Sequence, residues 1–219
     1  MDILNKITIG DAKKLTEALI PKQSIDFIIC DPVYSQIDDY EWVANVSRRI
    51  LKPDSSIIVF CSDIKMFDCQ QIMNKFIHLK FVKPLYYVVK AKQFSALRGY
   101  NIMTWTTPAL WFTNGKGWPH TRTLDTIVTG GAAQGNHKWN KNSEAYARWI
   151  KDFTHPDETI FDPFAGSGTI AKVCKQTGRN YISFEIDEST GIQAQKELDQ
   201  IIGVQIEIGD IINAKQASF

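Results

Sequence analysis

The stretch CDPVYS, Cys30 to Ser35, sets a carboxylate, a proline and an aromatic ring directly after an apolar run, IDFII. A short apolar run bounded by turn residues is typical of a buried strand, and proline holds the following turn in one backbone conformation. The strand would then end in Asp31, Pro32 and Tyr34. Taken alone, this pattern fits either a functional turn or a plain strand-ending turn with a buried ring.

A second stretch, FDPFAGSGT (161–169), has the residue types of a cofactor-binding turn. An apolar strand runs into Asp162, small residues follow, and a helical pattern begins behind them. Glycine lets the backbone approach a ligand closely, and the start of a helix offers free N–H groups. About twenty residues further on, the next strand ends in Glu185, which is placed to accept hydrogen bonds from a ribose diol. The stretch predicts an adenosine-bearing cofactor at the carboxyl end of a parallel sheet, and it matches neither GxGxxG nor a phosphate loop.

The elements that position these two turns alternate between strand and helix patterns. Such alternation predicts a doubly wound, mainly parallel α/β sheet. The predicted strands are 6–10, 24–31, 57–62, 81–90, 108–115, 159–164, 179–187 and 204–209. The predicted helices are 11–20, 38–51, 63–76, 142–153, 167–178 and 187–202, and KPDSS (52–56) is predicted as a turn.

Residues 91–141 break this alternation, because they hold six glycines and four tryptophans and show no clear helix. The segment is also part of a basic region. Between Lys80 and Lys151 there are eleven Lys or Arg and two acids, although the whole chain has a net charge of only +1. Basic residues interleaved with aromatic ones are typical of a surface that stacks on nucleic-acid bases, while a merely solvated basic loop is the alternative. We therefore divide the chain into a catalytic half (1–90), a basic, irregular target-recognition insertion (91–141) and a cofactor-binding half (142–219).

The remaining composition indicates a cytoplasmic protein. No apolar run approaches the roughly 18 residues that span a membrane, and the N-terminus lacks a signal-peptide pattern. The four cysteines have no metal-type or redox-type spacing, which favours reduced, buried thiols. The histidines likewise lack the partner spacing of a metal site, so we expect no metal.

DPFAGSGT together with the upstream D-P-x-Y resembles the DNA amino-methyltransferases that use S-adenosylmethionine, and the motif order resembles their β subgroup. The resemblance covers most of the chain and implies a Rossmann-like methyltransferase fold. NHKWNK (136–141) is similar to the family's H-x-x-x-K-P element, which helps to bind the methionine end of the cofactor. Asn142 stands where the proline of that element is usual, and Val33 stands where D-P-P-Y has its second proline.

The resemblance implies that CDPVYS handles an exocyclic amine, whose lone pair is delocalised into the base. The carboxylate of Asp31 and the carbonyl of Pro32 would accept its N–H groups and aim its lone pair at the methyl of a sulfonium. Tyr34 would stack on the target base after that base is flipped out of duplex DNA. Orientation and electrostatic placement would supply most of the catalysis. Because the acceptor carbonyl belongs to Pro32, we expect activity to persist with Val33.

The resemblance also assigns residues to the cofactor and to DNA. The residues expected to bind S-adenosylmethionine are Asp11, Asp31, Asn140, Lys141, Asp162, Phe164, Ala165, Gly166, Ser167, Gly168, Thr169 and Glu185. Asp210 lies in the same local pattern as Asp11 and is the second choice for the adenine contact. Phe164 is equally a core residue by its type, and Ser167 and Thr169 are equally simple helix caps. The expected phosphate contacts are Lys90, Lys92, Arg98, Lys116, Arg122 and Lys138.

The expected activity is methylation of adenine N6 in DNA, because an aspartate at the first place of D-P-x-Y is typical of adenine enzymes in this family. Methylation of cytosine N4, methylation of RNA, and a non-catalytic subunit that binds cofactor or nucleic acid stay open as alternatives. The segment 91–141 is short for a recognition domain. Either the recognised sequence is short, or a partner subunit or second copy of the chain assists.

Overall fold

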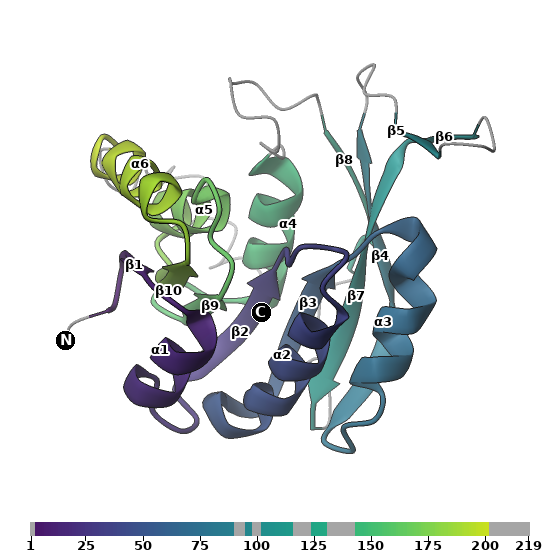
Figure 1. Cartoon of the computed structure of the whole chain (residues 1–219), viewed down its shortest axis with the longest axis horizontal. Coiled ribbons are helices and arrows are strands. Elements are labelled where there is room, and N and C mark those ends of the chain that lie inside the picture. The colour runs from purple at the N-terminus through teal and green to yellow at the C-terminus, as the bar shows by residue number, and fades with distance from the viewer. Residues whose placement is uncertain (1–2, 90–94, 98–101, 116–123, 131–142, 202–219) are drawn as a thin grey trace, which may run out of the picture.

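The computed structural model describes residues 3–89, 95–97, 102–115, 124–130 and 143–201. Their centre is an eight-stranded sheet with the order β1-β10-β9-β2-β3-β7-β4-β8 (Figure 1). The strands are β1 (Lys6–Ile9), β2 (Ile25–Cys30), β3 (Leu51–Phe60), β4 (Leu79–Val89), β7 (Thr106–Asn114), β8 (Ile127–Gly130), β9 (Thr159–Asp162) and β10 (Asn180–Glu185). A separate two-stranded sheet pairs β5 (Ser95–Leu97) with β6 (Ile102–Thr104).

The prediction of a mainly parallel sheet is confirmed. β7 runs antiparallel to both of its neighbours, β3 and β4, and the other strand pairs of the large sheet are parallel. β2 and β9 lie side by side at the centre, with Phe27 opposite Ile160 and Ile28 opposite Phe161. The two strands that carry the sequence motifs are therefore direct neighbours, although they are more than a hundred residues apart in the chain.

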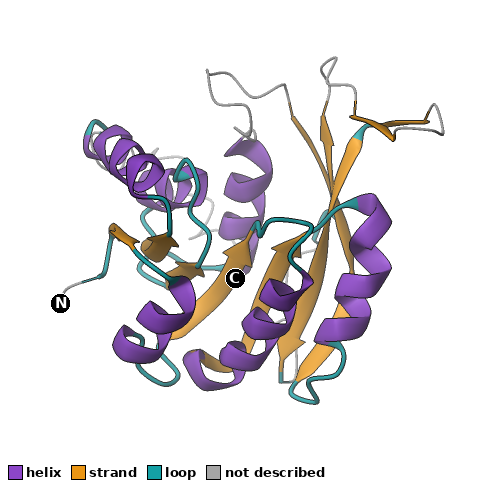
Figure 2. Ribbon diagram, viewed as in Figure 1, coloured by secondary structure: helices purple, strands orange, loops and turns teal. Residues whose placement is uncertain are grey.

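Helices cover both faces of the sheet (Figure 2), as predicted for a doubly wound fold. One core holds side chains from α1 (Ala12–Leu19), α2 (Ile37–Ile50) and α3 (Met66–Met73) against one face. The other holds side chains from α4 (Ser143–Phe153), α5 (Thr169–Thr177) and α6 (Glu188–Asp199) against the opposite face. In α4 the buried Tyr146, Trp149, Ile150 and Phe153 recur at helical spacing, which explains why this segment folds as a helix against the sheet.

The helix ends follow from their sequences. Asp11 and Asp187 cap α1 and α6 by accepting backbone N–H groups of the first turn. Gly178 ends α5 in the left-handed conformation that glycine adopts readily at the end of a helix. Predicted helix 63–76 was too long: a short 3-10 turn, η1 (Asp63–Lys65), precedes α3, which ends at Met73.

The turn predicted over KPDSS is wrong. β3 runs through these residues, because Leu51 pairs with Ile25 and Ser55 pairs with Asn114. Asp54 alone adopts a left-handed conformation, with φ of 59°, opposite Gly115. The pairs at Leu51 and from Ser55 onward lie on either side of this segment, and the register with β2 shifts between them, so the residues form an irregular part of the strand.

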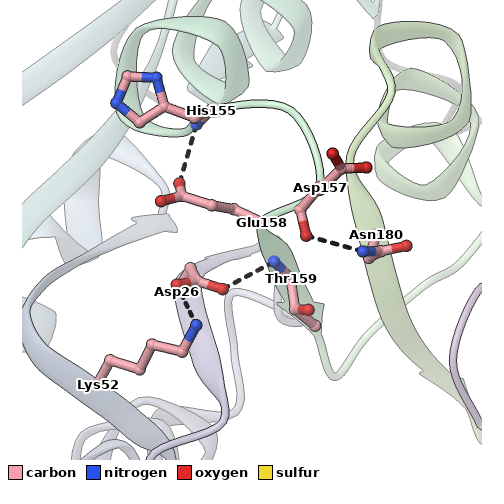
Figure 3. A network of polar contacts seen from close by, with 7 residues as sticks. All are labelled: Asp26, Lys52, His155, Asp157, Glu158, Thr159 and Asn180. Carbon is pink, nitrogen blue, oxygen red and sulfur yellow. Dashed lines mark hydrogen bonds and ion pairs between the residues drawn. The ribbon is translucent and has the colours of Figure 1, made fainter.

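The amino-terminal edge of the sheet is tied by ordinary polar contacts (Figure 3). Asp26 of β2 accepts hydrogen bonds from Lys52 Nζ of β3 at 2.6 Å and from the backbone N–H of Thr159 of β9 at 2.9 Å. Nearby, the carbonyl of Asp157 accepts from the side-chain amide of Asn180, and Glu158 accepts from the N–H of His155. A single carboxylate therefore joins three adjacent strands at the edge opposite the two motif turns.

Part of the segment 91–141 belongs to the large sheet, because β7 and β8 lie within it. The division into 1–90, 91–141 and 142–219 stays a prediction. The predicted strand 204–209 lies outside the described residues. Among the described residues, no helix is both long enough and apolar enough to cross a membrane.

Candidate active site

The turn after β2 lies at the carboxyl edge of the sheet. Pro32 is buried, Asp31 and Tyr34 are half-buried, and the side chain of Val33 is 60% exposed. Tyr34 packs against the core on the side of α4 to α6. The turn thus buries Pro32 and leaves Asp31 and Tyr34 partly accessible at this edge, with Oδ1 of Asp31 itself buried.

Two tyrosines lie beside Asp31. The hydroxyl of Tyr146, from α4, donates to Asp31 Oδ2 at 3.4 Å. Burial first, and then the charge of Asp31, raise the pKa of Tyr146 well above its usual value. The same two causes raise the pKa of Tyr34, with a hydrogen bond to Asp31 adding to them. Both phenols therefore stay protonated and act as donors toward the carboxylate.

The turn after β9 is held by the side chain of Asp162 and by the backbone of the neighbouring strand β10. Asp162 Oδ1 accepts the N–H of Phe164 at 3.1 Å, and the N–H of Ala165 donates to the carbonyl of Phe184 at 2.8 Å. Gly166 and Gly168 have left-handed φ angles of 51° and 73°. A Cβ at Gly166 would meet nothing within 4 Å, whereas one at Gly168 would lie 3.0 Å from Ile7 Cδ1. The lack of a side chain at Gly168 therefore allows close packing against β1. At Gly166 it leaves the backbone open to the space beside the turn.

Glu185 links this turn to the end of β10. Its Oε2 accepts the N–H of Gly166 at 2.7 Å, and its Oε1 accepts the N–H of Asp187 at 2.9 Å. Two backbone donors thus fix the carboxylate beside the open turn. The neighbouring Ile186 is 75% exposed, so an apolar side chain lies next to the carboxylate at the same edge.

Asp162 is the most unusual acid of the site. It is 1% exposed, and its Oδ2 is a buried oxygen without a hydrogen-bond partner among the described residues. Burial raises the pKa of Asp162 to about 8; the N–H of Phe164 opposes this rise, and the charges of Asp31 and Glu185 add to it. A buried, unsatisfied carboxyl is costly for a fold, and such groups concentrate at functional sites.

The structure shows the contacts of three other predicted residues, Asp11, Ser167 and Thr169. Asp11 caps α1 through Oδ1, which accepts the N–H of Lys13 at 2.8 Å. Gly168 occupies the cap position of α5, while the hydroxyls of Ser167 and Thr169 bond each other at 3.1 Å. Neither hydroxyl is therefore the simple cap that its residue type suggests.

Phe164 is half-buried and packs edge-on against Trp42 of α2, with ring centroids 6.0 Å apart. This contact places one side of the Phe164 ring in the core, as expected for a core residue. Its backbone N–H is bound to Asp162. The ring therefore joins the turn after β9 to helix α2.

The structure brings together the predicted residues that follow β2, β9 and β10. Asp31, Asp162 and Glu185 lie close enough that the charges of the other two raise the pKa of Asp162. The predicted residues outside the described part of the chain are Lys90, Lys92, Arg98, Lys116, Arg122, Lys138, Asn140 and Lys141. Asp210 also lies outside it.

Three residues of the site were missed by sequence reasoning: Trp42, Tyr146 and Ile186. Tyr146 and Trp42 occur at helical spacing with core residues, so their pattern indicates packing and nothing more. Ile186 had a usable signal, since an apolar residue directly after a strand-ending acid faces the same edge as that acid. Among the described residues, no group of three or more His, Cys, Asp or Glu could hold a metal ion, and all four cysteines are buried free thiols.

Comparisons with known proteins agree with this geometry. Residues 110–196 match the family model N6_N4_Mtase, described as DNA methylase. The chain is 28% identical over 216 residues to the "Putative methylase YubD" of Escherichia coli (strain K12), which covers 86% of this chain and 88% of that protein.

Two solved structures share the fold. The M1.HpyAVI–SAM complex has a TM-score of 0.73 at 21% identity and covers 90% of this chain and 99% of its own. The cytosine-N4-specific PvuII DNA methyltransferase has a TM-score of 0.75 at 18% identity and covers 94% of this chain and 89% of its own. The family match covers residues 110–196, and the chain shares the fold of these two methyltransferase structures.

Proposed function

We propose that the protein transfers a methyl group from S-adenosylmethionine to the N6 amine of adenine in DNA. The observation that carries this proposal is the convergence of the two motif turns. Asp31 and the glycine turn 165–168 follow the neighbouring strands β2 and β9 at one edge of the sheet. In an open α/β sheet, this carboxyl edge is where ligands bind.

The residues of the glycine turn fit an adenosine-bearing cofactor. Gly166 leaves open space above its backbone, and Glu185 is held beside it by two N–H groups, facing the place where a ribose diol would lie. Phe164 and Ile186 provide apolar surface for an adenine ring. The buried Oδ2 of Asp162 suits a cationic group, because a nearby positive charge would stabilise its ionised form. The cofactor supplies an activated methyl group on a sulfonium.

The residues of the first turn would prepare the amine. The carboxylate of Asp31 and the carbonyl of Pro32 are the two acceptors for its N–H groups, so that its lone pair points away from them. Asp31 is also placed to hold the proton that the amine gives up when it gains the methyl group. Tyr34, half-buried beside Asp31, would offer the accessible side of its ring to the flipped base.

Duplex DNA is the proposed partner, and the cytoplasm is the proposed place of action. Lys90, Lys92, Arg98, Lys116, Arg122 and Lys138 are proposed to contact phosphates, with Asn140 and Lys141 at the methionine end of the cofactor. These roles rest on the sequence alone. Neutralising Lys90, Lys92 and Arg98 together should weaken DNA binding and flatten its salt dependence.

Cytosine N4 is the second candidate target, because the PvuII enzyme, named as cytosine-N4-specific, shares the fold. The deciding experiment incubates the protein with S-adenosylmethionine and unmethylated genomic DNA and then identifies modified nucleosides by mass spectrometry. N6-methyladenine supports the proposal, and N4-methylcytosine keeps the mechanism while overturning the choice of base. A parallel reaction with RNA and an Asp31→Ala control complete the test. Methylation of RNA alone, or by the control, contradicts the proposal.

A further inference from the structure

We propose that Tyr146 is a positioning residue that fixes the orientation of the Asp31 carboxylate for methyl transfer. The inference rests on the proposed function, since it assigns a role in the same reaction. It concerns a side chain that comes from α4, outside both sequence motifs. Tyr146 would act on Asp31 and would not touch the reacting atoms.

The contact between Tyr146 and Asp31 joins a hydroxyl donor to a carboxylate acceptor. The Tyr146 hydroxyl lies 3.4 Å from Asp31 Oδ2. Its raised pKa keeps the proton on the phenol, so it donates toward the carboxylate at any ordinary pH. A carboxylate turns readily about its bond to the β-carbon. A donor on one oxygen selects one orientation and thereby directs the second oxygen.

The hydroxyl is held by a helix that is packed firmly at both ends. The Tyr146 ring lies 5.0 Å from the ring of Phe60, which also contacts Trp149 at 5.4 Å. At the other end of α4, Phe153 stacks on Phe27, with centroids 5.3 Å apart and planes 8° from parallel. Sites built on helices and strands position side chains better than sites on loops.

These contacts also set where the hydroxyl lies along the sheet. Phe153 of α4 contacts Phe27 within β2, and Tyr146 of α4 contacts Asp31 directly after β2, so the helix runs antiparallel to the strand. From Phe153 to Tyr146 the helix rises about 10 Å, and from Phe27 to Asp31 the strand spans about 13 Å. The stacking of Phe153 on Phe27 therefore brings Tyr146 to the level of the catalytic carboxylate.

A purely structural role for the hydroxyl is the competing account. Tyr146 is 3% exposed, and a buried hydroxyl needs a partner whatever it does for catalysis. The ring would fill the same space as phenylalanine, so packing alone does not require the oxygen. Tyr146→Phe separates the two accounts, because it keeps the ring beside Phe60 and removes only the hydroxyl.

The first measurement is the single-turnover rate of methyl transfer to DNA at saturating cofactor, together with cofactor affinity and melting temperature. For Tyr146→Phe we expect the rate to fall about 10-fold, with cofactor affinity within about two-fold of wild type and the melting temperature nearly unchanged. The matched control is Tyr181→Phe. Tyr181 is equally buried and donates its hydroxyl to the carbonyl of Asn5 at 2.8 Å, at the opposite edge of the sheet. This control should transfer at the wild-type rate.

The second measurement needs no substrate. The unfolding equilibrium constant is compared for wild type, Tyr146→Phe, Asp31→Ala and the double variant. If the hydroxyl clamps Asp31, removing it should change this constant about 10-fold more when Asp31 is present than when it is absent. Additive effects would overturn the proposed contact.

The outcomes separate the two proposals. Transfer by wild type and by Tyr146→Phe at equal rates overturns the positioning role and leaves the proposed function intact. Absence of transfer by wild type to any DNA overturns the proposed function, and the role in transfer falls with it. A slow Tyr146→Phe variant with normal cofactor affinity and non-additive coupling to Asp31 supports the assignment.

Discussion

Two aspartates on adjacent strands show how differently this sheet treats its two edges. Asp26, near the amino end of β2, is bound by Lys52 and by the N–H of Thr159 (Figure 3). Asp162, at the carboxyl end of β9, is more deeply buried, has one oxygen without a described partner, and has a pKa raised to about 8. The first arrangement lowers the free energy of the fold, and the second raises it.

This difference indicates where the protein gives up stability for function. A fold selected for stability alone would pair both acids, since an unsatisfied buried carboxyl costs more than its removal. The unpaired carboxylate oxygen of Asp162 occurs at the edge that carries Asp31 and the glycine turn, whereas the unpaired buried groups elsewhere among the described residues, such as the hydroxyls of Thr16 and Thr113, are uncharged. The following substitutions test this contrast, beginning with the largest expected effect.

Asp31→Ala should reduce the rate of methyl transfer by roughly 10³-fold and weaken cofactor binding far less, by no more than about 10-fold. The carboxylate is proposed to orient the amine, and the turn after β9 is proposed to hold the cofactor. Single-turnover kinetics and equilibrium titration with cofactor measure the two quantities. Transfer at the wild-type rate would refute the proposed mechanism.

Asp162→Asn should remove a pH dependence from the unfolding free energy. Because the pKa of Asp162 is about 8 in the folded protein and about 4 in the unfolded chain, the folded protein holds this proton more tightly. The wild-type unfolding free energy therefore falls as pH rises from about 4 to about 8 and then levels off. The variant lacks this contribution, so it should gain stability relative to wild type across the same window. Urea unfolding at several pH values measures the difference, and parallel curves would contradict the prediction.

Asp26→Ala should lower the unfolding free energy by about 2 kcal/mol, because the N–H of Thr159 and the ammonium of Lys52 both lose their acceptor. The transfer rate should stay at the wild-type value, in contrast to Asp31→Ala on the same strand. Urea unfolding and the transfer assay measure the two effects. Glu158→Ala, which removes one exposed acceptor from the same edge, is the control and should cost less than 1 kcal/mol. If Asp26→Ala lost activity without losing stability, this result would contradict the proposed difference between the amino and carboxyl edges of the sheet.

Gly166→Ala should weaken cofactor binding about 10-fold, or about 1.4 kcal/mol, because its Cβ would project into the open space over the turn. The strained backbone should also cost the fold about 1 kcal/mol. Gly178→Ala is the matched control, since it has φ of 70° at the end of α5 and should cost similar stability with no change in affinity. Equal affinities for the two variants would exclude this turn from the cofactor site.

Val33→Pro should change the transfer rate by less than about two-fold, the smallest effect of the series. The acceptor carbonyl belongs to Pro32, and the side chain of Val33 is largely exposed. Proline at this place would also restrict Pro32 to the extended region. A large loss of rate in the same assay would show that the valine has an adapted role.

Much of the fold could be predicted from the sequence, because each motif strand is a short apolar run that ends in an acid and a turn. The alternation of strands and helices then fixed the parallel, doubly wound class. The direction of β7 could not be read in this way, since the pattern of a buried strand is the same in either direction. The strand over Lys52 to Ser56 was hidden because it is irregular: the register with β2 shifts across it, and only the pairs at either end keep it within β3.

The site was predictable where chemistry and sequence position coincide, as at Asp31 and Gly166. It was not predictable where a contact depends on packing. Tyr146 reaches Asp31 only because α4 lies antiparallel across β2, an arrangement set by the rings of Phe27, Phe60 and Phe153. The unsatisfied oxygen of Asp162 likewise results from the burial of a strand end, which the residue type does not reveal.

The pairing of β2 with β9 has a consequence for how the chain is made on the ribosome. Phe27 pairs with Ile160, which is translated 133 residues later. The interval along the chain between the edge strand β1 and its partner β10 is longer still. At a synthesis rate of about 5–20 residues per second, β2 exposes an unpaired apolar edge for roughly 7–27 s before its neighbour emerges. Such an edge can pair with strands of other nascent chains. Because β2 comes early in the chain and β9 comes late, this edge of β2 stays without its partner until most of the chain has been translated.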